Sequence, residues 1–212
     1  MNEVLQKLHE YAVVPVVVVD DAKDAKNLAK ALVEGGLPCA EVTFRTAAAE
    51  ESIRQMVEAY PEMLVGAGTV LTVEQAKRAV AAGSKFIVSP GFNPKVVQYC
   101  VENNIPITPG VQTPTEVEMG LEFGLEVLKF FPAEPAGGLN MIKALCGPYV
   151  NTYFMPTGGL TTKNVRDYLS FNKIWAVGGT WIAKKEAIAA GEFDKIKANA
   201  EEACAIVKEV RG

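Results

Sequence analysis

One lysine in this chain stands where a charged side chain is least expected. In "LEVLKFFPAE", residues 125–134, Val127, Lys129 and Phe131 share one parity of a strand's two-residue repeat, and Leu128 and Phe130 share the other, so neither face is polar. A buried ammonium is costly, so such a lysine pairs with an acid, reaches solvent or loses its proton. A neutral lysine amine attacks carbonyl groups and forms Schiff bases, and we interpret Lys129 as such a nucleophile.

A second polar set lies in "AEVTFRT", residues 40–46. Glu41, Thr43 and Arg45 share one parity there and therefore point to the same side of the predicted strand. Three polar side chains cannot all face packed hydrocarbon, so this side faces a polar interior or solvent. In a closed barrel it faces the interior, where Glu41 would meet Lys129. A purely structural ion pair is the alternative.

Two Gly-Gly pairs complete the candidate chemistry, in "PTGGLTTKNV" and "AVGGTWI". Each is expected to come immediately before a helix, where free backbone N–H groups and the positive helix end bind anions. Barrel enzymes often hold a substrate phosphate after their seventh and eighth strands. We therefore predict a phosphate site there, with the Thr180 hydroxyl as a further donor.

Short apolar runs alternate with amphipathic helical segments along the chain, which indicates repeated βα units around a parallel sheet. In one such helical segment Thr72 is a plausible N-cap, and Gly35-Gly36 ends another. Eight units in so short a chain predict a single (β/α)₈ TIM barrel with an N-terminal helix and a C-terminal outer helix. An open doubly wound sheet is the alternative. The predicted strands are 13–19, 40–44, 64–66, 86–88, 105–108, 127–130, 153–155 and 174–177.

The whole chain has the composition of an ordinary globular protein, with 212 residues, 49% hydrophobic, 22% charged and a net charge of -4. We expect one domain over residues 1–212, in the cytoplasm, with no nucleic-acid or membrane partner. The four cysteines are dispersed and the only histidine, His9, is expected at the surface. This favours free thiols and neither a disulfide framework nor a metal site.

The motifs "EVTFRT", "GAGTVL", "SPG", "KFFPAE", "PTGG" and "GGTW", in this order and on these strands, resemble one family. It comprises the bacterial 2-dehydro-3-deoxy-6-phosphogluconate (KDPG) aldolases and the 4-hydroxy-2-oxoglutarate (KHG) aldolases. The resemblance extends from the first strand to the eighth. It implies a class I aldolase of the Entner–Doudoroff pathway that needs no cofactor or metal, is usually a homotrimer, and cleaves its substrate to pyruvate and glyceraldehyde 3-phosphate.

The resemblance also implies a role for individual residues. Lys129 matches the Schiff-base lysine and Glu41 the general acid and base. The other matches are Arg45 and Thr69 for the pyruvate carboxylate, Pro90 and Phe131 for the apolar wall beside the imine, Thr157 for substrate stereochemistry, and Gly158, Gly159, Gly179 and Thr180 for the phosphate.

Two other functions stay open on the residues alone. A phosphosugar isomerase or epimerase would use the same barrel with Glu41 as the base. A non-catalytic phosphometabolite-binding protein would use Lys129 and Glu41 only as an ion pair. The preference among KDPG, its galactonate epimer and KHG is not determined by the sequence.

Overall fold

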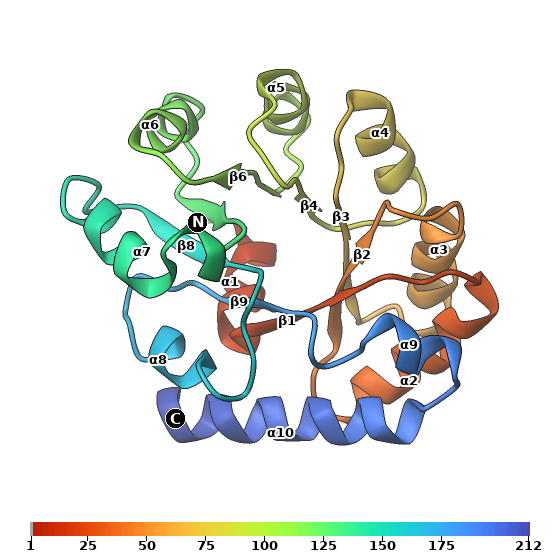
Figure 1. The fold of residues 1–212 in the computed structure, drawn as a ribbon. Helices are drawn as coiled ribbons and strands as arrows, with labels where there is room; N and C mark the ends of the chain where they lie inside the picture. Colours follow the sequence, from red (N-terminus) through yellow and green to blue (C-terminus); the bar gives the residue numbers. More distant parts are fainter. Residues whose placement is uncertain (1) are drawn as a thin grey trace.

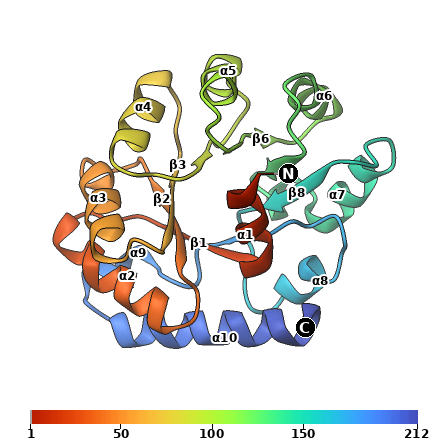
Figure 2. The ribbon, with the colours of Figure 1, turned by 180° about the vertical axis from the view of Figure 1, so that it is seen from behind.

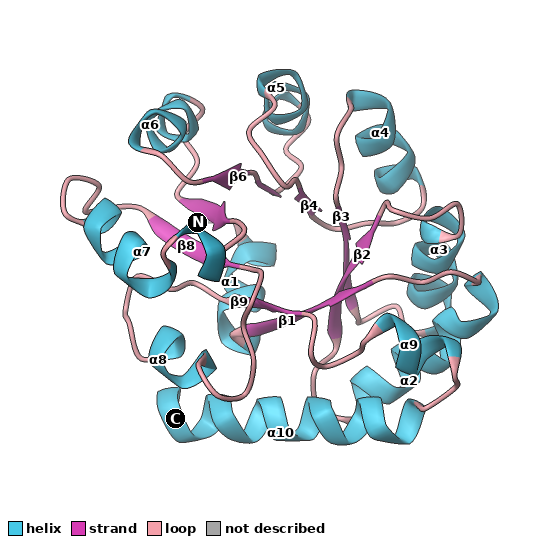
Figure 3. Cartoon of the chain, in the orientation of Figure 1, coloured by secondary structure: helices cyan, strands magenta, loops and turns pink. Residues whose placement is uncertain are grey.

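The computed structural model describes residues 2–212 and has an α/β fold, with the strands at the centre and helices outside them (Figures 1 and 3). The strands are β1 Val13–Val17, β2 Cys39–Thr43, β3 Leu64–Gly68, β4 Ile87–Val88, β5 Ile107–Thr108, β6 Gly110–Val111, β7 Val127–Phe130, β8 Tyr153–Pro156 and β9 Val177–Gly179. The α-helices are α1 Glu3–Tyr11, α2 Ala25–Glu34, α3 Ala49–Ala59, α4 Val73–Ala81, α5 Pro94–Glu102, α6 Pro114–Glu122, α7 Gly138–Cys146, α8 Val165–Leu169, α9 Lys185–Ala189 and α10 Phe193–Arg211. Two 3₁₀ turns, η1 Ala22–Asp24 and η2 Glu134–Ala136, complete the order.

All strand pairs are parallel and form two sheets. A curled six-stranded sheet has the order β5-β4-β3-β2-β1-β9, and a three-stranded sheet has the order β6-β7-β8. The single residue Pro109 separates β5 from β6 along the chain. Isolated parallel bridges, Phe154 with Ile174 and Thr157 with Gly178, join β8 to the segment that contains β9. The prediction of a parallel α/β fold is confirmed.

Burial explains why these segments form these elements. Every residue of β1 is buried, as is every residue of β2 and β3, which fits strands covered by helices on one side and by a filled interior on the other. The predicted helix signals are also observed. The Thr72 side chain accepts a hydrogen bond from the backbone of Gln75 at the start of α4. Gly35 and Gly36 end α2, and Gly36 has a φ of 81°.

Two predicted strand boundaries are wrong for identifiable reasons. We expected the last strand at 174–177, but β9 is Val177–Gly179 and pairs with β1 through both glycines. Low strand propensity made Gly178-Gly179 look like a loop. The predicted strand 105–108 is observed only at Ile107–Thr108, and β6 follows it, because Pro109 has no N–H to continue the ladder.

The two terminal helices lie where the sequence predicts them. Figure 2 shows α1 across the strands as seen from behind, where the Trp175 indole donates to the Leu5 carbonyl at 2.6 Å. The long α10 runs along one side of the molecule and contacts α2, α8 and α9 (Figure 1). None of the helices in residues 2–212 has the length and apolar character that a membrane span requires.

Candidate active site

The candidate chemical groups gather where the parallel strands end. Lys129 is the last residue but one of β7, and Glu41 is the central residue of β2, two positions before the end of that strand. Arg45 and Thr69 follow β2 and β3, and Pro90 follows β4. Carboxyl ends of parallel strands meet at one edge of a sheet, so one rim presents residues that lie far apart in the sequence.

Lys129 and Glu41 meet in the interior, as the sequence indicates. Lys129 is 4% exposed, Glu41 is fully buried, and the lysine Nζ lies 3.3 Å from Glu41 Oε1. Glu41 Oε2 is buried and has no hydrogen-bond partner among the described residues. A buried carboxylate with an unused oxygen beside a buried amine is expensive if it only stabilises the fold. It is well suited to moving protons to and from a bound molecule.

Two glycines make room for polar side chains of the site: Gly68 for Glu41 and Gly178 for Thr157. Our sequence analysis identified neither role. A Cβ on Gly68 would lie 2.1 Å from Glu41 Oε1, and a Cβ on Gly178 would lie 2.1 Å from Thr157 Oγ1. Both glycines are inside strands, where a missing side chain often marks a close approach of other atoms. The alternation of glycines at 66 and 68 in "GAGTVL" was the available signal. Our sequence analysis used that motif only as part of the family resemblance.

Arg45 and Thr69 form the second cluster at the rim. Arg45 Nε donates to Thr69 Oγ1 at 3.2 Å, and Arg45 is exposed, so its guanidinium also faces solvent. Thr69 has a φ of 55°, which is a strained backbone conformation for a β-branched residue. The threonine hydroxyl is thereby held beside an arginine fork, an arrangement suited to a carboxylate.

An aromatic ring lies on one side of the lysine. The Phe131 ring centroid lies 5.1 Å from Lys129 Nζ, which places the ring close enough for a cation–π contact. Pro90 lies at the end of β4, and its carbonyl approaches Gly110, the register partner of Lys129. Pro90 therefore borders the strand next to the lysine.

The predicted phosphate loops differ from expectation in one respect. Gly158 and Gly159 have φ values of 103° and 83°, which turn the chain sharply after β8. Gly179 is buried at the end of β9, and Thr180 is exposed directly after it. Neither glycine pair comes immediately before a helix, because α8 starts at Val165 and α9 at Lys185. Any anion there would meet loop amides instead of helix ends.

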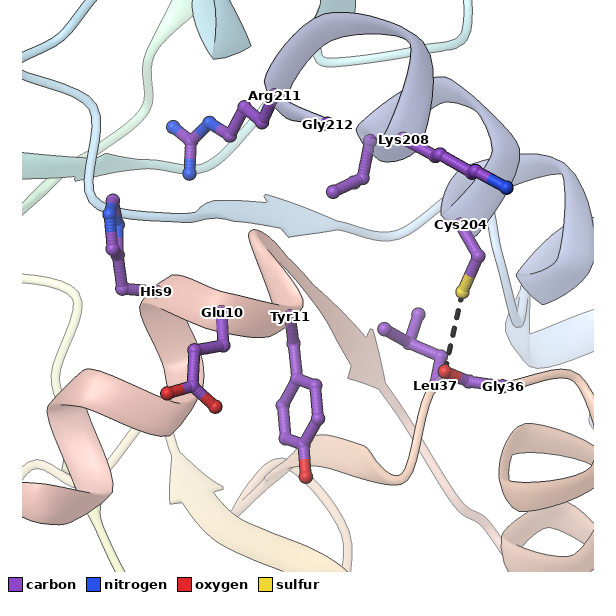
Figure 4. A pocket seen from close by; sticks show the side chains of 10 residues that line it. His9, Glu10, Tyr11, Gly36, Leu37, Cys204, Lys208, Arg211 and Gly212 are labelled. Atoms are coloured by element: carbon purple, nitrogen blue, oxygen red, sulfur yellow. Dashed lines mark hydrogen bonds between the residues drawn. The ribbon is translucent and has the colours of Figure 1, made fainter.

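A separate cavity of about 450 Å³ lies at the other end of the strands (Figure 4). His9 and Tyr11 at the end of α1, together with Cys204 and Arg211 of α10, contribute to its lining. His9 is exposed and stacks on Trp175, as expected of a surface residue. The guanidinium of Arg211 donates to three backbone carbonyls and fixes the end of α10. This lining therefore serves the packing of the terminal helices.

The metal-ligand and thiol chemistry of residues 2–212 is limited. No three side chains of His, Cys, Asp or Glu lie close enough together to hold a metal ion in this part of the chain. All four cysteines are free, as predicted. Cys39 and Cys100 are buried, whereas Cys146 and Cys204 are partly exposed. Burial raises the pKa of Cys100 to about 12 and raises that of Cys39 as well, with Cys204 adding to the effect on Cys39.

Fold and site together define a class of protein: a parallel α/β enzyme in which a lysine amine and a carboxylate from two different strands meet in the buried interior. Comparison with known families agrees. The family model described as KDPG and KHG aldolase matches residues 4–199. The chain belongs to this family.

Individual relatives are similar over nearly their whole length. The chain is 46% identical over 207 residues to the 2-dehydro-3-deoxy-phosphogluconate aldolase of Treponema pallidum, covering 98% of this chain and 99% of the relative. Its fold matches the KDPG aldolase of Legionella pneumophila, solved with pyruvate captured at low pH as a covalent carbinolamine intermediate. That match has a TM-score of 0.91, 37% identity and coverage of 94% and 97%. The Zymomonas mobilis ZM4 KDPG aldolase, solved with 3-phosphoglycerate, matches with a TM-score of 0.87, 40% identity and 95% coverage of both chains.

Proposed function

We propose that this chain is a class I aldolase that cleaves 2-dehydro-3-deoxy-6-phosphogluconate to pyruvate and glyceraldehyde 3-phosphate, with 4-hydroxy-2-oxoglutarate as a second substrate. The observation that carries the proposal is the buried pair of Lys129 Nζ and Glu41 Oε1 at 3.3 Å. The capture of pyruvate as a covalent carbinolamine in the similar Legionella enzyme supports the same chemistry here.

Imine formation is the first step. The neutral Lys129 amine attacks the keto carbon, a carbon–nitrogen bond forms, and the Glu41 carboxyl gives a proton to the ketone oxygen. The adduct nitrogen, positively charged after the attack, returns one proton to the Glu41 carboxylate. Glu41 then protonates the carbinolamine hydroxyl, water leaves, and a protonated imine remains. Glu41 is well placed for these transfers because one oxygen contacts the amine and the other has no partner among the described residues.

Cleavage follows from the electron demand of the imine. Glu41 takes the proton of the hydroxyl on the β carbon, and the bond between the α and β carbons breaks. Its electron pair moves into the imine to give an enamine, and the aldehyde leaves. Protonation of the enamine and hydrolysis of the imine then release pyruvate. The buried setting excludes the water that would otherwise compete for these protons.

The remaining predicted residues would bind the substrate. Arg45 and Thr69 would hold the carboxylate through the arginine fork and the threonine N–H and hydroxyl. Pro90 and Phe131 would border the imine. Thr157 has a buried hydroxyl without a partner among the described residues and would contact the substrate hydroxyl that sets its configuration. Gly158, Gly159, Gly179 and Thr180 would hold the phosphate through backbone amides and one hydroxyl.

Steady-state cleavage tests the function directly. Pyruvate release from each substrate is followed with lactate dehydrogenase and NADH, and glyceraldehyde 3-phosphate is measured in parallel. We expect both products in equal amounts from KDPG, and no activity in a Lys129→Met variant. An epimerase or isomerase would give a rearranged sugar acid and no pyruvate, and a binding protein would give neither.

We further propose that the two sheets form one closed (β/α)₈ barrel and that residues 1–212 are a single domain. The bridges from β8 to the β9 segment support closure on one side, and the one-residue step from β5 to β6 supports it on the other.

We also propose a homotrimer in the cytoplasm, where phosphorylated metabolites are retained because charged esters do not cross bilayers. Exposed apolar side chains on three consecutive outer helices, Val80, Val101 and Leu121, support an assembly. Light scattering should give three times the chain mass.

A further inference from the structure

The segment that follows the active-site lysine is held by a side chain that has no assigned role. β7 ends at Phe130, so the backbone of Phe131 lies beyond the last rung of the sheet. Gln112 Nε2 donates to the Phe131 carbonyl at 2.7 Å. Because a carbonyl only accepts hydrogen bonds, the amide must present its nitrogen there. Gln112 thus extends the pairing of Val111 with Phe130 by one more contact, made by a side chain.

Gln112 is itself fixed by Glu116. One carboxylate oxygen of Glu116 accepts from the backbone of Gln112 at 2.8 Å, and from the backbone and hydroxyl of Thr113 at 2.9 and 2.8 Å. Burial alone would raise the pKa of the Glu116 carboxyl, but these hydrogen bonds outweigh burial and lower it. Glu116 therefore stays ionised and keeps the loop before α6 in one conformation.

The opposite edge of the same segment is held by the strand that leads to the glycine loop. The backbone of Ala133 donates to the Thr157 carbonyl at 2.8 Å, and that of Glu134 donates to the Gly158 carbonyl at 3.0 Å. No backbone N–H of residues 2–212 makes such a ladder contact with the Phe131 carbonyl, and Gln112 supplies its hydrogen bond. Gln112 therefore anchors the carbonyl of the residue that carries the aromatic ring beside Lys129.

We infer that Gln112 is a positioning residue for the lysine chemistry: by clamping the Phe131 carbonyl, it holds the ring face beside Lys129 Nζ. The ring centroid lies 5.1 Å from this nitrogen. The face of an aromatic ring stabilises a nearby cation, so a fixed ring favours the positively charged imine over the neutral amine and ketone. This role rests on the proposed function, since it needs an imine at Lys129.

Two substitutions separate the clamp from simple packing. Gln112→Met keeps the length of the side chain and removes the donor at every pH. Gln112→Glu keeps the shape, but its carboxylate repels the carbonyl at neutral pH, and it regains a donor when it is protonated. Loss of one such hydrogen bond is expected to lower kcat about tenfold. KM for the phosphorylated substrate should change little, because the contacts of Ala133 and Glu134 with β8 remain.

The experiment measures kcat and KM for KDPG cleavage from pH 5 to pH 8 in the wild type, in both variants and in Gln98→Glu. Gln98 is a matched control, because it lies on the exposed face of α5 and donates only to Glu102 at 2.8 Å. We expect Gln112→Met to lose activity about equally at every pH, and Gln112→Glu to recover toward the wild type as the pH falls. Gln98→Glu should follow the wild type throughout.

The outcomes distinguish this inference from the function on which it rests. Wild-type values of kcat in both Gln112 variants, or losses in Gln112→Glu that do not depend on pH, would overturn the positioning role. An increase in KM with unchanged kcat would overturn it too, because it would assign Gln112 to substrate binding. If the wild type itself releases no pyruvate, the proposed function fails first.

Discussion

Adding one methyl group at Gly68 should disable the enzyme although no catalytic residue is substituted. In a Gly68→Ala variant the new Cβ would lie 2.1 Å from Glu41 Oε1, 2.6 Å from its Cγ and 2.7 Å from its Cδ. Non-bonded carbon atoms prefer separations of about 3.5–4.0 Å, so the carboxylate must move by about 1 Å or more. Glu41 is fully buried, so it cannot simply swing into solvent.

The expected loss of kcat follows from the contact between the Glu41 carboxylate and Lys129. Its contact with Lys129 Nζ is already 3.3 Å, and a further displacement takes the two groups out of hydrogen-bond range. A misplacement of about 1 Å in a catalytic group costs about 100-fold in rate. We therefore expect kcat of Gly68→Ala to fall about 100-fold, and its free energy of unfolding to fall by about 1–3 kcal/mol from overpacking.

Pyruvate release and chemical denaturation measure the two effects separately. Gly66→Ala is the control, because the atoms nearest to its Cβ would be those of the Phe86 ring at 2.3 Å, whereas at Gly68 they are those of Glu41, so it overpacks the same strand chiefly against a different side chain. It should lose stability and retain most of its kcat. In a Glu41→Gln background, Gly68→Ala should have almost no further effect on kcat, because the group that it displaces is no longer an acid. Independent, additive losses from the two substitutions would refute the reasoning.

Three further results are expected. Lys129→Met leaves the buried Glu41 carboxylate without its partner, so urea titrations should show a free energy of unfolding about 3–5 kcal/mol lower than in the wild type. The double variant Lys129→Met/Glu41→Gln should recover most of this loss, because it no longer contains an unpaired buried carboxylate. Thr69→Gly relieves the backbone strain at a φ of 55° but removes a hydroxyl of the carboxylate cluster. It should raise KM about tenfold and change the free energy of unfolding by less than about 1 kcal/mol, and an unchanged KM would contradict our assignment. Cys39 and Cys100 should resist iodoacetamide at pH 8 until urea unfolds the chain, since burial raises both thiol pKa values and leaves little thiolate; peptide mapping of the native protein checks this.

The two candidate catalytic side chains could be predicted from the sequence better than the glycines and hydrogen bonds that surround them. Lys129 could be singled out because both faces of its strand are apolar, and Glu41 because three polar side chains share one face. Their contact joins residues 88 positions apart, and predicting it required the guess that the strands enclose a common interior. Within short segments, composition and periodicity identify strands and helices well, because these features are local.

Features that depend on contacts between distant segments were missed. Gly68 is needed because the carboxylate of another strand fills the space beside it. The glycine spacing in the sequence does not say which distant side chain fills that space. The bond from Gln112 to the Phe131 carbonyl was missed for the same reason, since it joins a loop to the end of another strand. The glycines of β9 were interpreted as a loop, although their pairing with β1 keeps them in the sheet.

The most direct test of the central claim is to trap the imine. The protein is incubated with pyruvate and sodium borohydride and then digested, and each lysine-containing peptide is weighed by mass spectrometry. Our account predicts one reduced pyruvate adduct, on Lys129, and none in the Lys129→Met variant. A protein that cleaves its substrate but forms no adduct, or forms it on another lysine while Lys129 stays unmodified, would contradict the account.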